Sequence, residues 1–390
     1  MNDGNAETSG PVLRVVGESK IALWGLSAPE RMRRLFASCK LVLPQHSRIS
    51  APNDSVILAH GDYLLESRVA AAILDTPQTI LTLSTPSGPL PFAAHVDPIA
   101  ADLAERLLAR GLPLRPDEAP HGILVRDVTE AVPEYNYRLR KREAPSVVRL
   151  GEVGTRDLEW RTFMATYKGV TDIVTKYVWP VPAFWVTRWA AHWGITPNMV
   201  TSLGLLLVFV ASWLFVTDHL WLGLAAAWLM TFLDTVDGKL ARTTLTFSRS
   251  GALYDHAIDY IHQPFWWAAW WWGLRDGAGT DVALLDACAV ITVGGYAVVR
   301  FIEETFKRIY KVRIHVWERI DSVFRLITAR RNPNLVILTV AMLFGAPVTG
   351  FVLLAIWTAV SVLFHLVRFA QAEVRRFRGQ KLRSWLEQGA

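Results

Sequence analysis

The stretch DTVDGKLARTTLTFSRSGALYDHAIDY, residues 234–260, places four aspartates, several basic residues and two glycines between two apolar segments. Asp234 and Asp237 are spaced i, i+3, so they share one face of a helix. Asp255 and Asp259 are spaced i, i+4, so they share one face of the helix that follows. Because the connection between the helices is short, we expect antiparallel neighbours whose four carboxylates converge.

Six apolar stretches surround or include this segment, and a spanning helix needs about 20 residues. Basic residues lie between the second and third stretches, between the fourth and fifth, and after the sixth, whereas the opposite side carries Arg275 alone. This asymmetry predicts a multi-pass protein of the cell (inner) membrane with six transmembrane helices and cytoplasmic N- and C-termini. The predicted spans are 197–217, 219–240, 252–274, 282–302, 334–348 and 350–370.

Tryptophans are expected to mark the membrane surfaces. Trp185, Trp189 and Trp193 recur every four residues, which predicts a helix over 180–193 lying along the cytoplasmic interface. Five more are expected at headgroup level on the far side of the third span: Trp266, Trp267, Trp270, Trp271 and Trp272.

Charge and cysteine content narrow the class of protein. The formal net charge of +6 is compatible with nucleic acid, but most of the surplus base lies beside apolar stretches. The lipid bilayer is therefore the expected partner, and nucleic acid is not. Cys39 and Cys288 are far apart, so no disulfide framework is expected. The first ten residues lack an apolar core, so we expect no cleaved leader.

Four carboxylates at a membrane boundary need positive charge, since an ionised Asp costs about 2.5–3.5 kcal/mol at a bilayer centre. One interpretation is a salt-bridge network with Lys239, Arg242 and Arg249. A second is an intramembrane ion or proton transporter. A third is a pair of Mg²⁺ or Mn²⁺ ions, which prefer oxygen ligands and can hold both oxygens of a phosphoryl displacement. Gly238 and Gly251, which permit close approach, and Arg242, which can bind phosphate, favour the third.

Residues 234–259 match D-x2-D-G-x2-A-R-x8-G-x3-D-x3-D at every fixed position. This pattern resembles the signature of the CDP-alcohol phosphotransferases, also called CDP-alcohol phosphatidyltransferases. The resemblance extends over residues 165–375 and includes TPNMVT at 196–201. It implies a homodimeric membrane transferase that moves a substituted phosphate group from a CDP-alcohol to an acceptor hydroxyl and releases CMP, in phospholipid or phosphodiester biosynthesis. The donor would be CDP-diacylglycerol or a CDP-linked polar alcohol.

The same resemblance assigns roles to individual residues. Two Mg²⁺ or Mn²⁺ ions would be held by Asp234, Asp237, Asp255 and Asp259, with Asp259 also the catalytic base. The CDP pocket would be lined by Asn198, Thr201, Gly238, Ala241, Arg242, Ser248 and Gly251. Candidates for holding the acceptor are Lys176, Arg300 and Arg325, and the segment ARRNPN at 329–334 is either an acceptor site or a basic stop before the fifth span.

Residues 1–150 have the composition of a soluble domain, with strand candidates interleaved with helix-like stretches 65–74 and 98–110. This alternation predicts a cytoplasmic α/β domain. The expected strands are 12–16, 40–43, 55–59 and 79–83. We further expect a linker and interfacial helix over 151–195, the six-helix domain over 196–375 and a basic cytoplasmic tail over 376–390.

The stretch 56–74 resembles the strand–acid–helix element of nucleotidyltransferases, with Asp62 in the metal-binding position. The whole arrangement is similar to fusions of an inositol-phosphate cytidylyltransferase with a CDP-alcohol phosphotransferase. The expected phosphate loop, however, has Gly25 alone, followed by Pro29 and Glu30, which would hinder a cradle of backbone amides. We therefore expect a degenerate, catalytically silent domain, the alternative being a bifunctional enzyme with an active cytidylyltransferase.

Overall fold

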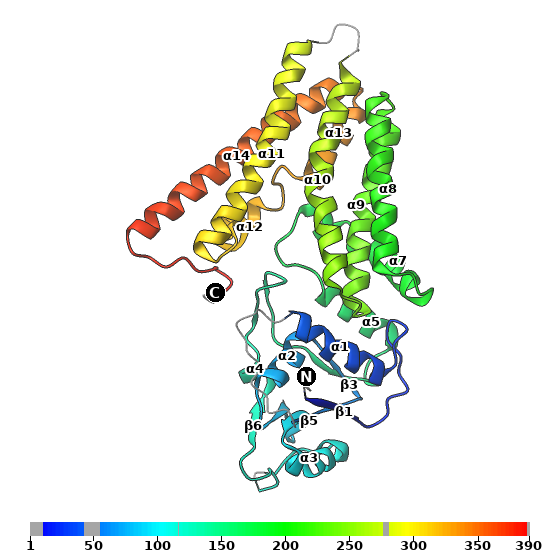
Figure 1. The fold of residues 1–390 in the computed structure, drawn as a ribbon, viewed down its shortest axis with the longest axis vertical. Coiled ribbons are helices and arrows are strands. Elements are labelled where there is room, and N and C mark those ends of the chain that lie inside the picture. The colour runs from blue at the N-terminus through cyan, green and yellow to red at the C-terminus, as the bar shows by residue number, and fades with distance from the viewer. Residues whose placement is uncertain (1–10, 43–54, 116, 276–280, 388–390) are drawn as a thin grey trace, which may run out of the picture. The chain divides into compact units, whose positions relative to one another are not determined.

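The computed structural model describes residues 11–42, 55–115, 117–275 and 281–387, which fall into two compact units (Figure 1). The first unit is formed by the described residues of 1–136, 143–163 and 242–247, and the second by those of 137–142, 164–241 and 248–390. The first ten residues, on which the leader prediction depends, lie outside the described part.

The first unit contains a mixed five-stranded sheet in the order β1-β2-β5-β4-β6. Strand β1 (Val12–Val16) pairs in parallel with β2 (Val56–His60). Strand β5 (Gly88–Val96) runs antiparallel to both β2 and β4 (Thr79–Thr85), and β4 pairs in parallel with β6 (Leu124–Asp127). The α/β prediction for this region is thus confirmed, with an antiparallel strand at the centre of the sheet.

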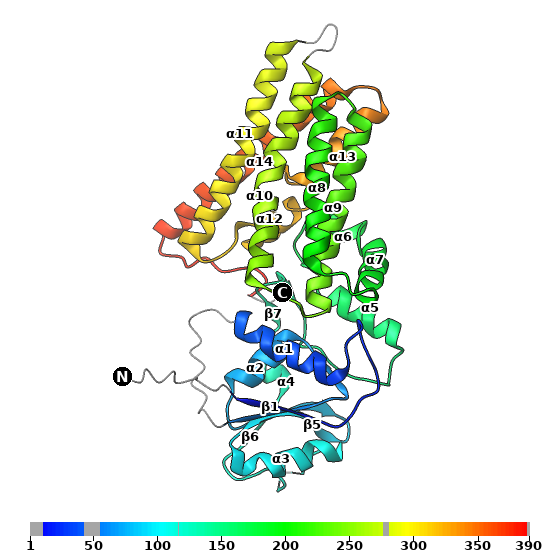
Figure 2. The same ribbon diagram turned by 45° about the vertical axis from the view of Figure 1, so that its right-hand side comes forward.

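Helices cover both faces of this sheet because each face carries its own apolar core (Figure 2). Helices α1 (Ala28–Val42) and α2 (Ser67–Asp75) contribute to one core, and α3 (Pro98–Arg110) contributes to the other. The predicted strand at 40–43 is wrong for residues 40–42, which end α1, while residue 43 lies outside the described residues. The helix continues there because the buried residues Met32, Leu35, Phe36 and Cys39 follow helical spacing.

The other elements of the first unit are short, apart from α5. They are β3 (Tyr63–Leu65), which pairs with β9 (Val147–Arg149), α4 (Val128–Ala131), β7 (Tyr135–Asn136) and α5 (Thr155–Ala165). Part of the predicted linker 151–195 therefore folds with the first unit. The rest of that segment, together with β8 (Lys141–Arg142), is assigned to the second unit.

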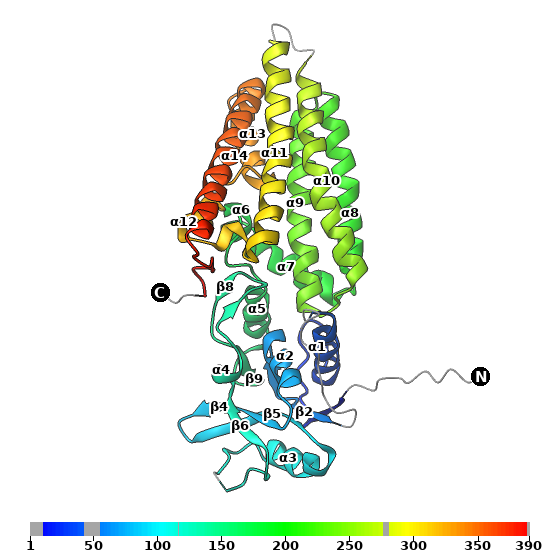
Figure 3. The same ribbon diagram turned by 60° about the vertical axis from the view of Figure 1, so that its left-hand side comes forward.

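The second unit is helical, and each predicted span is a helix over most of its length (Figure 3). Four of its described helices, α8, α9, α11 and α14, are long and apolar enough to cross a membrane. Helix α10 has 26 residues but carries two aspartates and other polar groups, and α13 has only 13 residues; a helix of that length spans about 20 Å, less than the hydrocarbon core. The six helices are α8 (Pro197–Val216), α9 (Leu220–Thr243), α10 (Arg249–Leu274), α11 (Val282–Tyr310), α13 (Arg331–Leu343) and α14 (Pro347–Phe377).

Helix α8 begins as the sequence predicts, since the Thr196 hydroxyl caps it by accepting from the amide of Met199 at 3.3 Å and Pro197 is its first residue. The expectation that the α10 tryptophans lie at a headgroup surface is wrong for Trp266, Trp267 and Trp270, which are fully buried. Trp266 and Trp270 pack against Phe215 of α8, and the indole of Trp266 donates to the carbonyl of Val208 at 3.2 Å.

Smaller elements precede α8 and follow α11. Helices α6 (Ile173–Tyr177) and α7 (Pro180–His192) precede α8, and Trp185, Trp189 and Trp193 are exposed along α7 and its end. The 3₁₀ turn η1 (Ile314–Val316) and helix α12 (Arg319–Phe324) follow α11. Beyond α14 the chain returns to this turn, where the amide of Trp385 donates to the carbonyl of Val316 at 3.3 Å.

Candidate active site

Three carboxylates meet between α9 and α10. One oxygen each of Asp234, Asp255 and Asp259 lies within 4.8 Å of the others. The helical spacing predicts this, because Asp255 and Asp259 lie one turn apart on the same face of α10. We call these three residues the acidic cluster.

The acidic cluster is bridged by Arg331, at the start of α13. Its Nη2 lies 2.5 Å from Asp234 Oδ2 and its Nη1 lies 3.0 Å from Asp259 Oδ1. Sequence reasoning did not single out this residue as part of the site. In the sequence, Arg331 is marked only by its place in the basic and amide-rich segment ARRNPN. It lies 97 residues beyond Asp234 along the chain. One guanidinium balances only part of the charge of three carboxylates.

Asp237, the fourth aspartate that was predicted to converge here, makes a contact with α8. Its Oδ2 accepts a hydrogen bond from the hydroxyl of Thr201 at 2.6 Å. Its Oδ1 is buried and has no hydrogen-bond partner among the described residues. A buried acceptor of this kind is uncommon in native proteins and points to a missing ligand.

The N-terminal ends of α8 and α10 approach each other closely beside Gly251. A Cβ atom there would lie 2.7 Å from Ser248 Oγ and 2.9 Å from Asn198 Oδ1, so glycine is the residue that fits. Ser248 caps α10 by accepting from the amide of Gly251 at 2.9 Å. Three residues predicted for the CDP pocket are thus brought together.

The remaining predicted CDP-pocket residues lie on the last turns of α9. Gly238, Ala241 and Arg242 are all partly buried there. The neighbouring ammonium group of Lys239, which the salt-bridge interpretation assigned to the aspartates, lies 2.9 Å from the centre of the Tyr167 ring. A cation–π contact of this kind stabilises the charge of a buried lysine.

A second charged group gathers around Glu303, on α11. Arg300 Nη1 donates to its Oε2 at 3.2 Å, and Arg330 pairs with the same oxygen. Arg300 also lies 4.1 Å from the centre of the Tyr260 ring, next to Asp259 in the chain. Arg325 lies near enough for the charges of Arg330 and Glu303 to act on it. We call Arg300, Arg325 and Arg330 the basic cluster.

Arg325 is buried, and its Nε and Nη1 have no hydrogen-bond partner among the described residues. Burial and the nearby charge of Arg330 lower the pKa of Arg325 to about 9, so its guanidinium remains protonated at neutral pH. The negative charge of Asp172 acts on Arg325. Burial alone would raise the pKa of Asp172, but the charge of Arg325 and hydrogen bonds from Thr175 and Asn332 lower it. Lys176, the third acceptor candidate, is exposed and lies over the Tyr177 ring at 5.5 Å.

The oxygen donors present here suit a divalent cation. Carboxylates from two helices and the unpartnered Oδ1 of Asp237 are hard ligands of the kind Mg²⁺ and Mn²⁺ prefer. The guanidinium of Arg331 already pairs with two of these carboxylates, as expected where negative charge is concentrated. The residues therefore fit a metal site.

The second unit thus combines four described helices that are long and apolar enough to cross a membrane with an acidic cluster between α9 and α10. Residues 194–363 match the family model of the CDP-alcohol phosphatidyltransferases. The match covers less than half of the chain.

Curated relatives carry related names. The chain is 38% identical over 87 residues to a phosphatidylinositol phosphate synthase of Mycobacteroides abscessus, which covers 20% of this chain and 40% of that protein. It is 38% identical over 71 residues to an archaetidylinositol phosphate synthase of Pyrococcus horikoshii, covering 18% of this chain and 38% of the relative. The match thus spans about two fifths of each relative's length.

Solved structures of the Mycobacterium tuberculosis phosphatidylinositol phosphate synthase are also similar. The one in complex with manganese and citrate has a TM-score of 0.38 and 24% identity, covering 47% of this chain and 87% of that one. The one with CDP-DAG bound has a TM-score of 0.37 and 24% identity, covering 47% and 91%.

Proposed function

We propose that this protein transfers a substituted phosphate group from a CDP-alcohol to an acceptor hydroxyl and releases CMP. The observation that carries the proposal is the acidic cluster of three carboxylates within 4.8 Å of one another, inside the part of the chain that matches the family model. The name of the Mycobacterium tuberculosis structure with CDP-DAG bound supports a CDP-alcohol, and CDP-diacylglycerol in particular, as donor.

Asp234, Asp255 and Asp259 would hold divalent cations, with the free Oδ1 of Asp237 as a further ligand. We propose two ions, Mg²⁺ or Mn²⁺, and the manganese in a relative's structure supports this choice. When bound, such ions polarise phosphoryl oxygens and stabilise the charge that develops on them.

Within this site, the chain's own residues position the substrates and move the proton. Two carboxylates pair with Arg331, and the side chain of Asp259 is more exposed than that of Asp234. Asp259 is the proposed base that accepts the proton of the attacking hydroxyl. Asn198, Thr201, Ser248 and Gly251 lie where the ends of α8 and α10 meet and would hold the cytidine diphosphate. Gly238, Ala241 and Arg242 would complete that pocket, with Arg242 neutralising the diphosphate.

The basic cluster is the proposed acceptor site. Its three guanidinium groups, of which that of Arg325 is buried, outnumber the carboxylate partner Glu303, and this excess favours an anion. An acceptor that carries a phosphate would supply that charge, and the names of both curated relatives, which contain "inositol phosphate", support this class. Arg300 and Arg325 would bind it, while Lys176, which is exposed, would act at the entrance.

We further propose six transmembrane spans, in which α10 and α13 join the four described helices that are long and apolar enough to cross a membrane. The distribution of basic residues supports cytoplasmic termini in an inner membrane, and the exposed tryptophans of α7 support a helix at the interface. A homodimer is proposed from the family resemblance.

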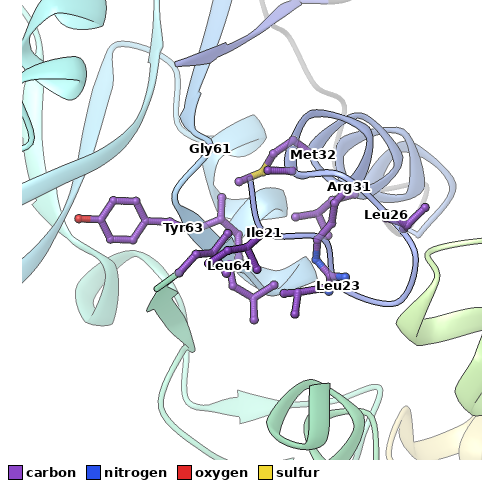
Figure 4. A pocket seen from close by; sticks show the side chains of 12 residues that line it. Ile21, Leu23, Leu26, Arg31, Met32, Gly61, Tyr63 and Leu64 are labelled. Atoms are coloured by element: carbon purple, nitrogen blue, oxygen red, sulfur yellow. The ribbon is translucent and has the colours of Figure 1, made fainter. Parts of the chain in front are cut away.

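The first unit is proposed to be catalytically silent. In its would-be phosphate loop, Leu23 and Leu26 bond each other's backbone at 3.0 Å, and the amide of Trp24 donates to Glu159 at 3.1 Å. These amides are therefore not available to cradle a triphosphate. The adjoining pocket is lined almost entirely by apolar side chains, with Arg31 as its one charged residue (Figure 4).

The test is to incubate purified protein with a panel of CDP-alcohols and acceptors and to measure CMP with and without Mg²⁺ or Mn²⁺. Metal-dependent CMP release supports the transferase. Ion flux in liposomes without CMP release would instead support the transporter interpretation. Pyrophosphate release from CTP and a polyol phosphate would show that the first unit is an active cytidylyltransferase.

A further inference from the structure

The carboxylate of Glu303 is joined to four other side chains. Its Oε2 accepts from Arg300 at 3.2 Å and from Arg330. Its Oε1 accepts from His315 Nε2 at 2.9 Å and lies 3.8 Å from His365 Nε2. These partners come from α11, η1, the segment before α13, and α14. One partly buried acid therefore joins residues that are far apart in the sequence.

The basic cluster also carries buried donors that point to a ligand. The Nε atoms of Arg300 and Arg330, and the Nε and Nη1 atoms of Arg325, have no partner among the described residues. Leaving such donors buried and unpaired is costly. An anion with several oxygens would satisfy them, while Glu303 occupies only one nitrogen of Arg300 and one of Arg330.

The two imidazoles and the carboxylate also have the spacing of metal ligands, since their ligand atoms lie within 4.8 Å of one another. The charges argue against a metal here. Arg300 and Arg330 already share this carboxylate, and the charge of Arg325 lies nearby. A divalent cation would add two positive charges to a group with a single negative one.

We propose that Glu303 is a positioning residue of the acceptor site: it orients Arg300 and Arg330 so that their free N–H groups converge with those of Arg325 on a phosphate. This inference rests on the proposed function of the basic cluster. A carboxylate that acted only as a counter-charge would compete with the phosphate, so its removal would tighten anion binding. A carboxylate that positions the guanidiniums has the opposite effect.

The experiment measures binding of inorganic phosphate to the purified full-length protein by calorimetry, together with the KM values for donor and acceptor. Glu303→Gln should weaken phosphate binding and raise the acceptor KM by about ten- to a hundredfold, the cost of a small misplacement, with the donor KM unchanged. Glu303→Asp, which keeps the charge but withdraws it by one methylene, should weaken phosphate binding by a smaller factor. Glu373→Gln, which removes a carboxylate paired with Tyr310 on the same unit, is the matched control and should bind as wild type.

Unchanged or tighter phosphate binding in Glu303→Gln would overturn the proposal, and so would wild-type affinity in Glu303→Asp. A wild-type protein that binds no phosphate would overturn it as well. Should Glu303→Gln not fold, Glu303→Asp decides alone, because its buried ion pairs keep their charge. Weakened phosphate binding in a protein that releases no CMP would support the positioning role and contradict only the transferase.

Discussion

The second unit contains two charged clusters of opposite sign beside the same turn of α10. In the acidic cluster, three carboxylates share one guanidinium, that of Arg331. In the basic cluster, the guanidiniums of Arg300 and Arg330 share one carboxylate, that of Glu303, and Arg325 lies close by. Neither cluster is balanced by the side chains that pair within it.

The sign of the excess charge indicates which kind of ligand each cluster would bind. An excess of carboxylate favours cations, and an excess of guanidinium favours an anion such as phosphate. The two are neighbours, since Arg300 stacks on Tyr260 and the Tyr296 hydroxyl donates to the Asp259 carbonyl at 3.4 Å. The proposed reaction would use both, with the donor at the acidic cluster and the acceptor at the basic cluster.

The largest expected effect is on the acidic cluster. Asp259→Asn keeps the shape of the side chain but removes the proposed base, which contributes on the order of 10²–10⁴-fold to a rate. CMP release should fall by at least that factor in a steady-state assay. The control is Asp286→Asn, which alters an acid near the start of α11 that pairs with Arg275. This variant should keep its activity. Activity of Asp259→Asn within tenfold of wild type would remove Asp259 from the chemistry.

A smaller effect is expected in the basic cluster. Arg325→Met should raise the acceptor KM by about ten- to a hundredfold, since hydrogen bonds to charged groups contribute about 1.5–3 kcal/mol. The same change removes a buried charge that has unpaired donors, but it also removes the positive charge that stabilises the Asp172 carboxylate, so its two effects on the melting temperature oppose each other. Arg319→Met, beside Trp385, is the control. A lower melting temperature with a wild-type acceptor KM would make Arg325 a structural residue.

The next effect distinguishes a cation site from a salt-bridge network. Arg331→Gln leaves Asp234 and Asp259 without their pairing guanidinium, so the melting temperature in EDTA should fall by a few degrees; about 1 kcal/mol shifts it by 2–4 °C in a domain of this size. Mn²⁺ should restore the loss by supplying the missing charge. Equal destabilisation with and without Mn²⁺ would favour the salt-bridge interpretation.

The smallest effect is expected in the first unit. Asp62→Asn should leave CMP release within about twofold of wild type, as is usual for substitutions outside a reacting site. The loop that should hold a nucleotide in that unit has its amides bonded internally. A large loss of CMP release would connect this unit to the reaction.

The local parts of this structure could be predicted from the sequence, and the tertiary parts could not. Helical spacing brought Asp255 and Asp259 to one face, and Thr196 with Pro197 marked the start of α8. Arg331 lies far from Asp234 along the chain, and no spacing rule connects them. The fully buried Trp266 could not be distinguished from an interfacial tryptophan, because both positions favour a large ring with one polar atom.

Strand β5 was missed for a related reason. Pro89 and Pro91 lack the amide that a sheet needs and argue against a central strand. In the structure, the pairing of β4 with β5 shifts register between Leu81 and Thr82, and Thr82 is the residue that pairs with Pro91. The irregularity accommodates the proline, and no property of the single strand predicts it.

The central claim is that carboxylates on α9 and α10 hold divalent cations. Its most direct test is an anomalous-scattering map from crystals of the protein grown with Mn²⁺. We predict manganese peaks between Asp234, Asp255 and Asp259, with Arg331 withdrawn from the carboxylates that it pairs with here. A map without a peak there, and with Arg331 still paired to Asp234 and Asp259, would contradict the account.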